Sequence, residues 1–196
     1  MLVANESQER KSNPIEAGAY IARCVQIIDL GDQYNELADK YARKVMLTFE
    51  IPSERVEVNG ESKPRLMSKT YTLSLNEKAT LRKDLESWYG ALDFPFDIRR
   101  VMGLPCTINV VSKKSKTGNE YSVIGSVGRP MKGIPVPAQE TESLVYDIDG
   151  EDALEAVEKL PEWIAKTIKE SPSYKMVLQK KEELVELKVN EDELPF

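Results

Sequence analysis

Histidine is absent from this chain of 196 residues, and cysteine occurs only twice, as Cys24 and Cys106. Without histidine the chain lacks the commonest metal ligand and the usual general base, which argues against most hydrolases. The two cysteines lie far apart in apolar segments, so we expect reduced thiols in the core rather than a disulfide. The sequence predicts no catalytic residue, no metal site and no cofactor.

Long apolar runs are also lacking, because none approaches the ~20 residues that a membrane-spanning helix needs. The polar residues 1–13 carry charges of both signs and fit neither a signal peptide nor a transit peptide. We therefore expect a cytoplasmic protein that does not contact membranes. With 41% hydrophobic and 31% charged residues, the composition is typical of one globular domain with an appendage.

Positive charge is scarce overall, since the net charge is −6, but it is unevenly distributed. Residues 1–137 hold 20 Lys+Arg against 17 Asp+Glu, a net +3, whereas residues 138–196 hold 7 against 16, a net −9. A mildly basic body joined to an acidic tail is typical of proteins with an interaction tail. Solubility alone is the alternative explanation for the tail.

The first part of the chain has the patterns of β-strands. Residues 19–30 are β-branched and apolar between two glycines, and residues 65–75 alternate between apolar and polar. Between them, residues 41–51 alternate with Val45, Leu47 and Phe49 on one face, which predicts a half-buried strand. Asn59-Gly60 supplies the hairpin turn before the third strand.

A change of period then predicts a helix over residues 77–92, with Leu81, Leu85 and Trp88 on one face. Residues 105–113 and 119–128 follow as a last hairpin. The expected fold is mainly β with helices: a five-stranded OB-fold barrel with a helix between strands three and four, plus a C-terminal helical and acidic extension. An SH3-like barrel and an α+β sandwich are the alternatives.

Prolines and glycines between residues 128 and 138 indicate the edge of this domain. We expect five regions, which are a flexible leader (1–14), the OB-fold domain (15–130), a linker (131–150), a helical extension (151–188) and an acidic partner-binding tip (189–196). Amphipathic spacing in the extension does not decide whether it packs on the barrel, pairs chains into a homo-oligomer or binds a partner.

An OB-fold of this kind binds single strands with cations for the phosphates and aromatic rings for the bases. The expected DNA-binding residues are the tyrosines and cations on the second and third strands and the flanking loops: Tyr34, Tyr41, Arg43, Lys44, Lys69, Tyr71, Lys113, Lys114, Lys116 and Tyr121. Tyr71 and Tyr121 are in phase with apolar neighbours, a pattern that also fits core residues. The basic hairpin around Lys113 is the best of these groups.

The C-terminal tip is a second candidate site, formed by Glu191, Asp192, Glu193, Leu194, Pro195 and Phe196. Phe196 can occupy an apolar pocket of a partner while basic residues there contact the carboxylates. Pro195 stiffens the segment and lowers the cost of ordering it.

Several segments resemble bacteriophage single-stranded DNA-binding proteins, namely those at 17–31, 44–50, 68–75, 81–88 and 160–164. The tip is similar to the acidic, Pro-Phe-terminated tails of bacterial single-stranded DNA-binding proteins, with Leu194 where those more often have isoleucine. The glycine- and glutamine-rich linker of the bacterial proteins is missing. The resemblance implies sequence-tolerant binding of single-stranded DNA in phage replication or recombination, in an infected bacterial host, with replication or recombination proteins recruited by the tip.

Two other functions compete with this one. In the first, the barrel binds a protein of the replication machinery rather than DNA. The second is a magnesium-dependent nuclease that uses Asp147, Asp149, Glu151 and Asp152, which we expect to be solvated because no scaffold makes them converge. The charge split further suggests that the acidic tail competes with DNA for the basic groove of the same molecule.

Overall fold

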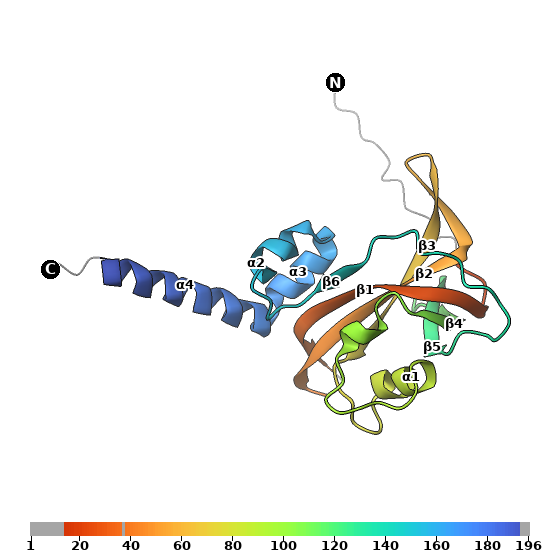
Figure 1. Cartoon of the computed structure of the whole chain (residues 1–196), viewed down its shortest axis with the longest axis horizontal. Helices are drawn as coiled ribbons and strands as arrows, with labels where there is room; N and C mark the ends of the chain where they lie inside the picture. The colour runs from red at the N-terminus through yellow and green to blue at the C-terminus, as the bar shows by residue number, and fades with distance from the viewer. Residues whose placement is uncertain (1–13, 37, 193–196) are drawn as a thin grey trace.

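The computed structural model describes residues 14–36 and 38–192. Five strands form a curled antiparallel sheet in the order β3-β2-β1-β4-β5 (Figure 1). They are β1 (Gly18–Asn35), β2 (Lys40–Val58), β3 (Glu61–Thr72), β4 (Pro105–Lys114) and β5 (Glu120–Gly128). The two outer strands approach each other, since Lys69 Nζ on β3 donates to the carbonyl oxygen of Gly125 on β5 at 2.7 Å. This mainly β architecture is consistent with an OB-like fold.

The inner face of the curled sheet holds the main core, which α1 (Thr80–Trp88) covers from one side. Leu81, Leu85 and Trp88 of α1 are buried, as their helical spacing predicted. The ring of Trp88 lies 5.8 Å from the ring of Phe49 on β2, and its indole N–H donates to the carbonyl oxygen of Pro105. A short helix, η1 (Ile98–Val101), completes the connection from α1 to β4.

A second core lies on the opposite face of the sheet, where the C-terminal segment packs. It is built by β6 (Leu144–Tyr146), α2 (Ala153–Ala156), η2 (Val157–Lys159) and α3 (Glu162–Glu170), which lie across the sheet from α1 (Figure 1). On β1, Ile27 belongs to the main core and Ile28 to the second. Burial on both faces explains why residues 24–30 are almost continuously apolar.

The prediction that the second strand is half-buried is wrong. Met46, Thr48 and Glu50, on the face opposite Val45, are at most 3% exposed. Met46 packs into the second core, and the Glu50 carboxylate accepts hydrogen bonds from the backbone N–H groups of Glu140 and Thr141. The Glu50 end of this polar face is therefore covered by a segment 90 and 91 residues later in the sequence.

The segment that we expected to be a linker is attached to the barrel at several points. Arg23 donates to the carbonyl oxygen of Pro137 at 2.9 Å, and Glu50 holds the backbone at residues 140 and 141. β6 then pairs in parallel with residues 26–28 of β1, on the edge that β4 leaves at Arg23. Residues 137–146 thus form a strap that brings the C-terminal helices onto the sheet.

The last helix, α4 (Pro172–Asp192), projects from this body (Figure 1). The start of the helix is packed against the body, because Tyr174 is buried. Ser171, just before the helix, lies so close to Gly31 of β1 that a side chain at position 31 would clash with it. Over 21 residues the helix rises about 30 Å. Of the predicted tip, Glu191 and Asp192 end the helix, whereas Glu193, Leu194, Pro195 and Phe196 lie outside the described residues.

No helix within residues 14–36 and 38–192 combines the length and the apolar character needed to span a membrane.

Candidate nucleic-acid interface

Two predicted tyrosines form an exposed aromatic pair at the end of the β1–β2 hairpin. Tyr34 and Tyr41 are register partners across the two strands, with ring centroids 5.3 Å apart. They are 51% and 58% exposed. The Tyr34 hydroxyl donates to the carboxylate of Asp39, and this hydrogen bond raises the pKa of Tyr34. Exposed rings fixed at a hairpin end are suited to stacking on unpaired bases.

The predicted basic hairpin between β4 and β5 is also exposed. Lys113 lies opposite Tyr121 in the register, and Tyr121 is 43% exposed although its spacing also fitted a core residue. Lys114 lies 3.7 Å from the carboxylate of Glu120, but Lys113 and Lys116 form no ion pair with any described residue. Their charges remain available to phosphates.

Three other predicted residues are engaged within the protein. Tyr71 is only 3% exposed, which corrects its prediction as a base-stacking residue. Its hydroxyl donates to Asp84 Oδ2 at 2.8 Å, and burial raises its pKa. Lys69 Nζ donates to the same oxygen at 2.7 Å, and Arg43 is held by the carboxylates of Asp29 and Asp149. These cations stabilise the fold and are not free for phosphate.

The remaining candidates therefore form two groups rather than one. Lys44 accompanies the tyrosine pair on β2, with its Nζ 2.7 Å from Thr72 Oγ1 on β3. The register pairs Gly18 with Val110, so the β4–β5 hairpin extends past the start of β1, whereas Tyr34 is near its end. A single strand of DNA that contacts both the tyrosine pair and the basic hairpin therefore has to run along the barrel.

An aromatic group on the connection after α1 was not predicted from the sequence. Phe94 is 58% exposed, and the guanidinium of Arg82 lies 5.1 Å from its ring centroid. The guanidinium of Arg100 contacts the rings of Tyr89 and Phe96, at 5.0 and 5.1 Å. One signal was present in the sequence, because Pro95 disfavours helical backbone at Phe94 and so indicates that the helix ends before this ring. Phe94 offers a further surface for base stacking.

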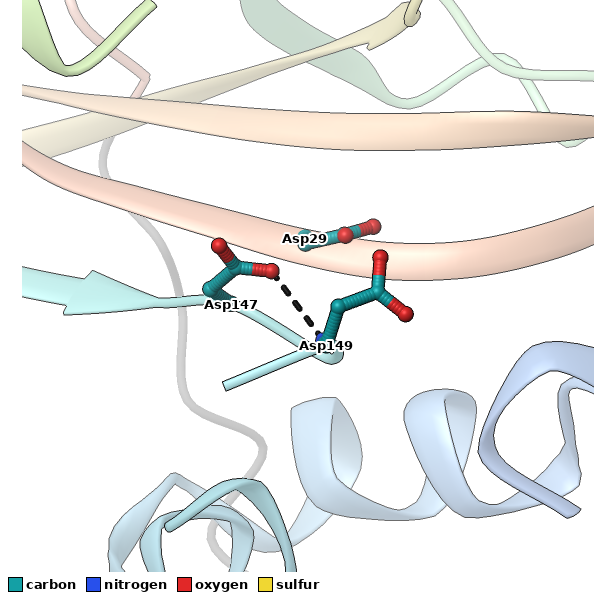
Figure 2. Close-up of side chains that lie close together, drawn as sticks. All are labelled: Asp29, Asp147 and Asp149. Carbon is teal, nitrogen blue, oxygen red and sulfur yellow. Dashed lines mark hydrogen bonds between the residues drawn. The ribbon is translucent and has the colours of Figure 1, made fainter. Parts of the chain in front are cut away.

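A cleft of about 560 Å³ opens beside the connection after α1, where the inner face of the sheet is left uncovered at one end. Its lining includes Asp29 and Arg43 from the strands, Phe96 from the connection after α1, and Asp147 and Asp149 from the segment after β6. Figure 2 shows the three carboxylates facing one another, and their nearest oxygens lie within 4.8 Å. The backbone N–H of Asp149 donates to Asp147 Oδ1 at 3.1 Å.

The expectation that this acidic stretch lacks a scaffold is wrong for Asp147 and Asp149. They lie in the turn after β6, which the hydrogen bond from the Gly150 N–H to the Asp147 carbonyl oxygen closes, and their carboxylates meet the buried Asp29 of β1 (Figure 2). Carboxylates so placed are the ligand type that Mg²⁺ prefers. Arg43, however, bonds to Asp29 and lies 2.7 Å from Asp149, and these carboxylates in turn raise its pKa. The arrangement is that of an ion-pair network.

No protein-family model matches this chain, and no curated protein matches it either.

Proposed function

We propose that this protein binds single-stranded DNA without strong sequence preference, through an OB-fold barrel, and acts in phage DNA replication or recombination inside the bacterial host. The observation that carries the proposal is the exposure of aromatic rings and unpaired lysines on two hairpins of a curled five-stranded sheet. The proposal assigns no catalytic residue.

The chemistry of the two hairpins supports this function. Each base stacked on an aromatic ring contributes ~1–3 kcal/mol, and every base has a face that can stack, so such contacts tolerate any sequence. Lysines that release counterions from phosphates add affinity that falls with salt. Tyr34 and Tyr41 supply the first contribution, and Lys113 and Lys116 supply the second.

The tip at 191–196 is the proposed docking segment for replication or recombination proteins. The direction of α4 bears on this role, because the helix leads Glu191 and Asp192 away from the barrel (Figure 1). A helix about 30 Å long weighs against the expectation that the acidic tail competes with DNA in the same molecule. It favours presentation of the tip to a partner.

The test is the affinity of the full chain for a fluorescein-labelled oligothymidine, followed by anisotropy at low salt. Replacing Tyr34 and Tyr41 together by alanine is expected to weaken binding at least tenfold, which corresponds to about 1.4 kcal/mol. Trp163→Ala is the matched control, because Trp163 is an aromatic residue that is 61% exposed on α3 and belongs to neither hairpin. Unchanged affinity of the variant that lacks both tyrosines would remove the tyrosine pair from the interface.

A second candidate function, in which the barrel binds a protein, is favoured by the charged cleft alone. The two functions use different surfaces, so separate variants test them.

A further inference from the structure

We propose that the cleft at the open end of the sheet is a docking site for a partner protein, whose bound segment carries an apolar side chain next to a lysine or arginine. This site is distinct from the proposed DNA contacts, and its occupancy does not depend on them. The proposal rests on the shape, the lining and the charge of the cleft.

The cleft has the size and lining of a binding site. Its volume of about 560 Å³ falls in the range of sites that take a ligand or a few side chains, and such sites are frequent at the mouths of β-barrels. Ile27, Val45 and Phe96 from the main core line it. Leu73 and Val145, at 39% and 43% exposure, add apolar surface at its edges. An apolar side chain inserted there would be removed from water.

The charges around this apolar surface do not balance. The charged residues that line the cleft are Asp29, Asp97, Asp147 and Asp149 against Arg43 and Arg99. Arg43 pairs with Asp29 and Asp149, and Arg99 pairs with Asp97 at 2.8 Å. Within the described residues, the Asp147 carboxylate accepts the backbone N–H of Asp149 and forms no ion pair within 4.0 Å, and its nearest interaction with a cation is a longer-range one with Arg99, which already pairs with Asp97. A positively charged group is what would complete the network.

The excess of carboxylates in the cleft lining favours some kinds of bound group over others. A phosphate or the acidic tip of a second copy would meet carboxylates of the same sign, which disfavours binding. A lysine or arginine beside an apolar side chain matches both the lining and the charge. A neutral nucleobase matches the lining without using Asp147, and it is therefore an outcome that the experiment must distinguish.

The experiment uses capped tripeptides with one central ring, Lys-Phe-Lys, Gln-Phe-Gln and Glu-Phe-Glu, titrated into the ¹⁵N-labelled full chain. We expect the lysine peptide to shift the backbone amide signals of Phe96, Val145 and Asp147 in a saturable way, at least tenfold more tightly than the glutamate peptide. Asp147→Asn should weaken the lysine peptide about fivefold. Asp93→Asn, which removes an exposed carboxylate outside the cleft, should leave its affinity unchanged.

Two results would overturn the proposal. One is equal binding of the three peptides, or no saturable shift at these amides with any of them. The other is a shift of the same amides by oligothymidine and not by the lysine peptide, which would make the cleft a base-binding site. Neither result depends on whether DNA binds at the two hairpins, because that binding is tested separately by the oligothymidine affinity of the variant that lacks Tyr34 and Tyr41.

Discussion

Replacing Glu50 by glutamine tests whether the strap of residues 137–146 is fixed to the barrel by a buried carboxylate. Glu50 has no solvent exposure and lies on the outer face of β2. Its oxygens accept the N–H of Glu140 at 3.1 and 3.3 Å and the N–H of Thr141 at 2.6 Å. Glutamine keeps the size of the side chain but removes its charge and turns one acceptor into a donor.

The expected loss of stability in Glu50→Gln follows from the two backbone N–H groups that donate to Glu50. A hydrogen bond to a charged group contributes ~1.5–3 kcal/mol and a neutral one ~0.5–1.5 kcal/mol, so losing the charge at two donors costs about 2 kcal/mol. In a protein of this size that loss lowers Tm by about 4–8 °C. Urea unfolding followed by tryptophan fluorescence gives the free energy of unfolding, and calorimetry gives Tm.

Glu57→Gln is the matched control for this prediction. Glu57 lies on the same strand but is exposed, and its side chain has no hydrogen bond or ion pair in the described part of the chain. Its replacement should change the free energy of unfolding by less than about 0.5 kcal/mol. If Glu50→Gln is no more destabilising than Glu57→Gln, the carboxylate does not hold the strap.

Three further predictions concern the core and the interface. Asp84→Ala should destabilise the protein by about 3 kcal/mol because it leaves the ammonium of Lys69 without its carboxylate, and adding Lys69→Met should recover part of the loss in urea unfolding. Burial raises the pKa of Cys24 to about 12 from 9.0, so the unfolded thiol ionises first as pH rises. The contribution of Cys24 to the free energy of unfolding should therefore be constant below about pH 9 and fall between pH 9 and 12, and a thiol reagent should label Cys24 at pH 8 only in urea; labelling of the native protein would contradict its burial. Phe94→Ala should weaken oligothymidine binding about fivefold or more in anisotropy while Phe94→Trp preserves it, and equal affinity of both variants would exclude this ring from the interface.

The order of elements in the barrel could be predicted from periodicity alone. Alternation identified β2 and β3, and the change to helical spacing identified the buried face of Leu81, Leu85 and Trp88. The second core could not be predicted, because it depends on contacts between β1 and residues far away in the sequence. Met46 illustrates this, since a polar-looking face of β2 is buried only when α2 and α3 pack on it.

The candidate site was predicted only in part, for a similar reason. Exposed tyrosines and lysines on hairpins depend on local sequence, and Tyr34, Tyr41 and Lys113 are exposed as that role requires. Whether a cation on a strand is free depends on which carboxylate the fold brings near it. Arg43 meets Asp149, which is 106 residues away, and no local pattern signals that contact.

The most direct test of the central proposal is the affinity of the unmodified chain for oligothymidine as salt is raised from 20 to 300 mM. Binding through lysine contacts to phosphates predicts measurable affinity at low salt and a logarithmic decline with a slope of about −0.7 for each contact on a single strand. A variant with Lys113 and Lys116 replaced by glutamine should show a slope smaller in magnitude by about 1.4. No binding at 20 mM salt would contradict a DNA-binding function for this protein.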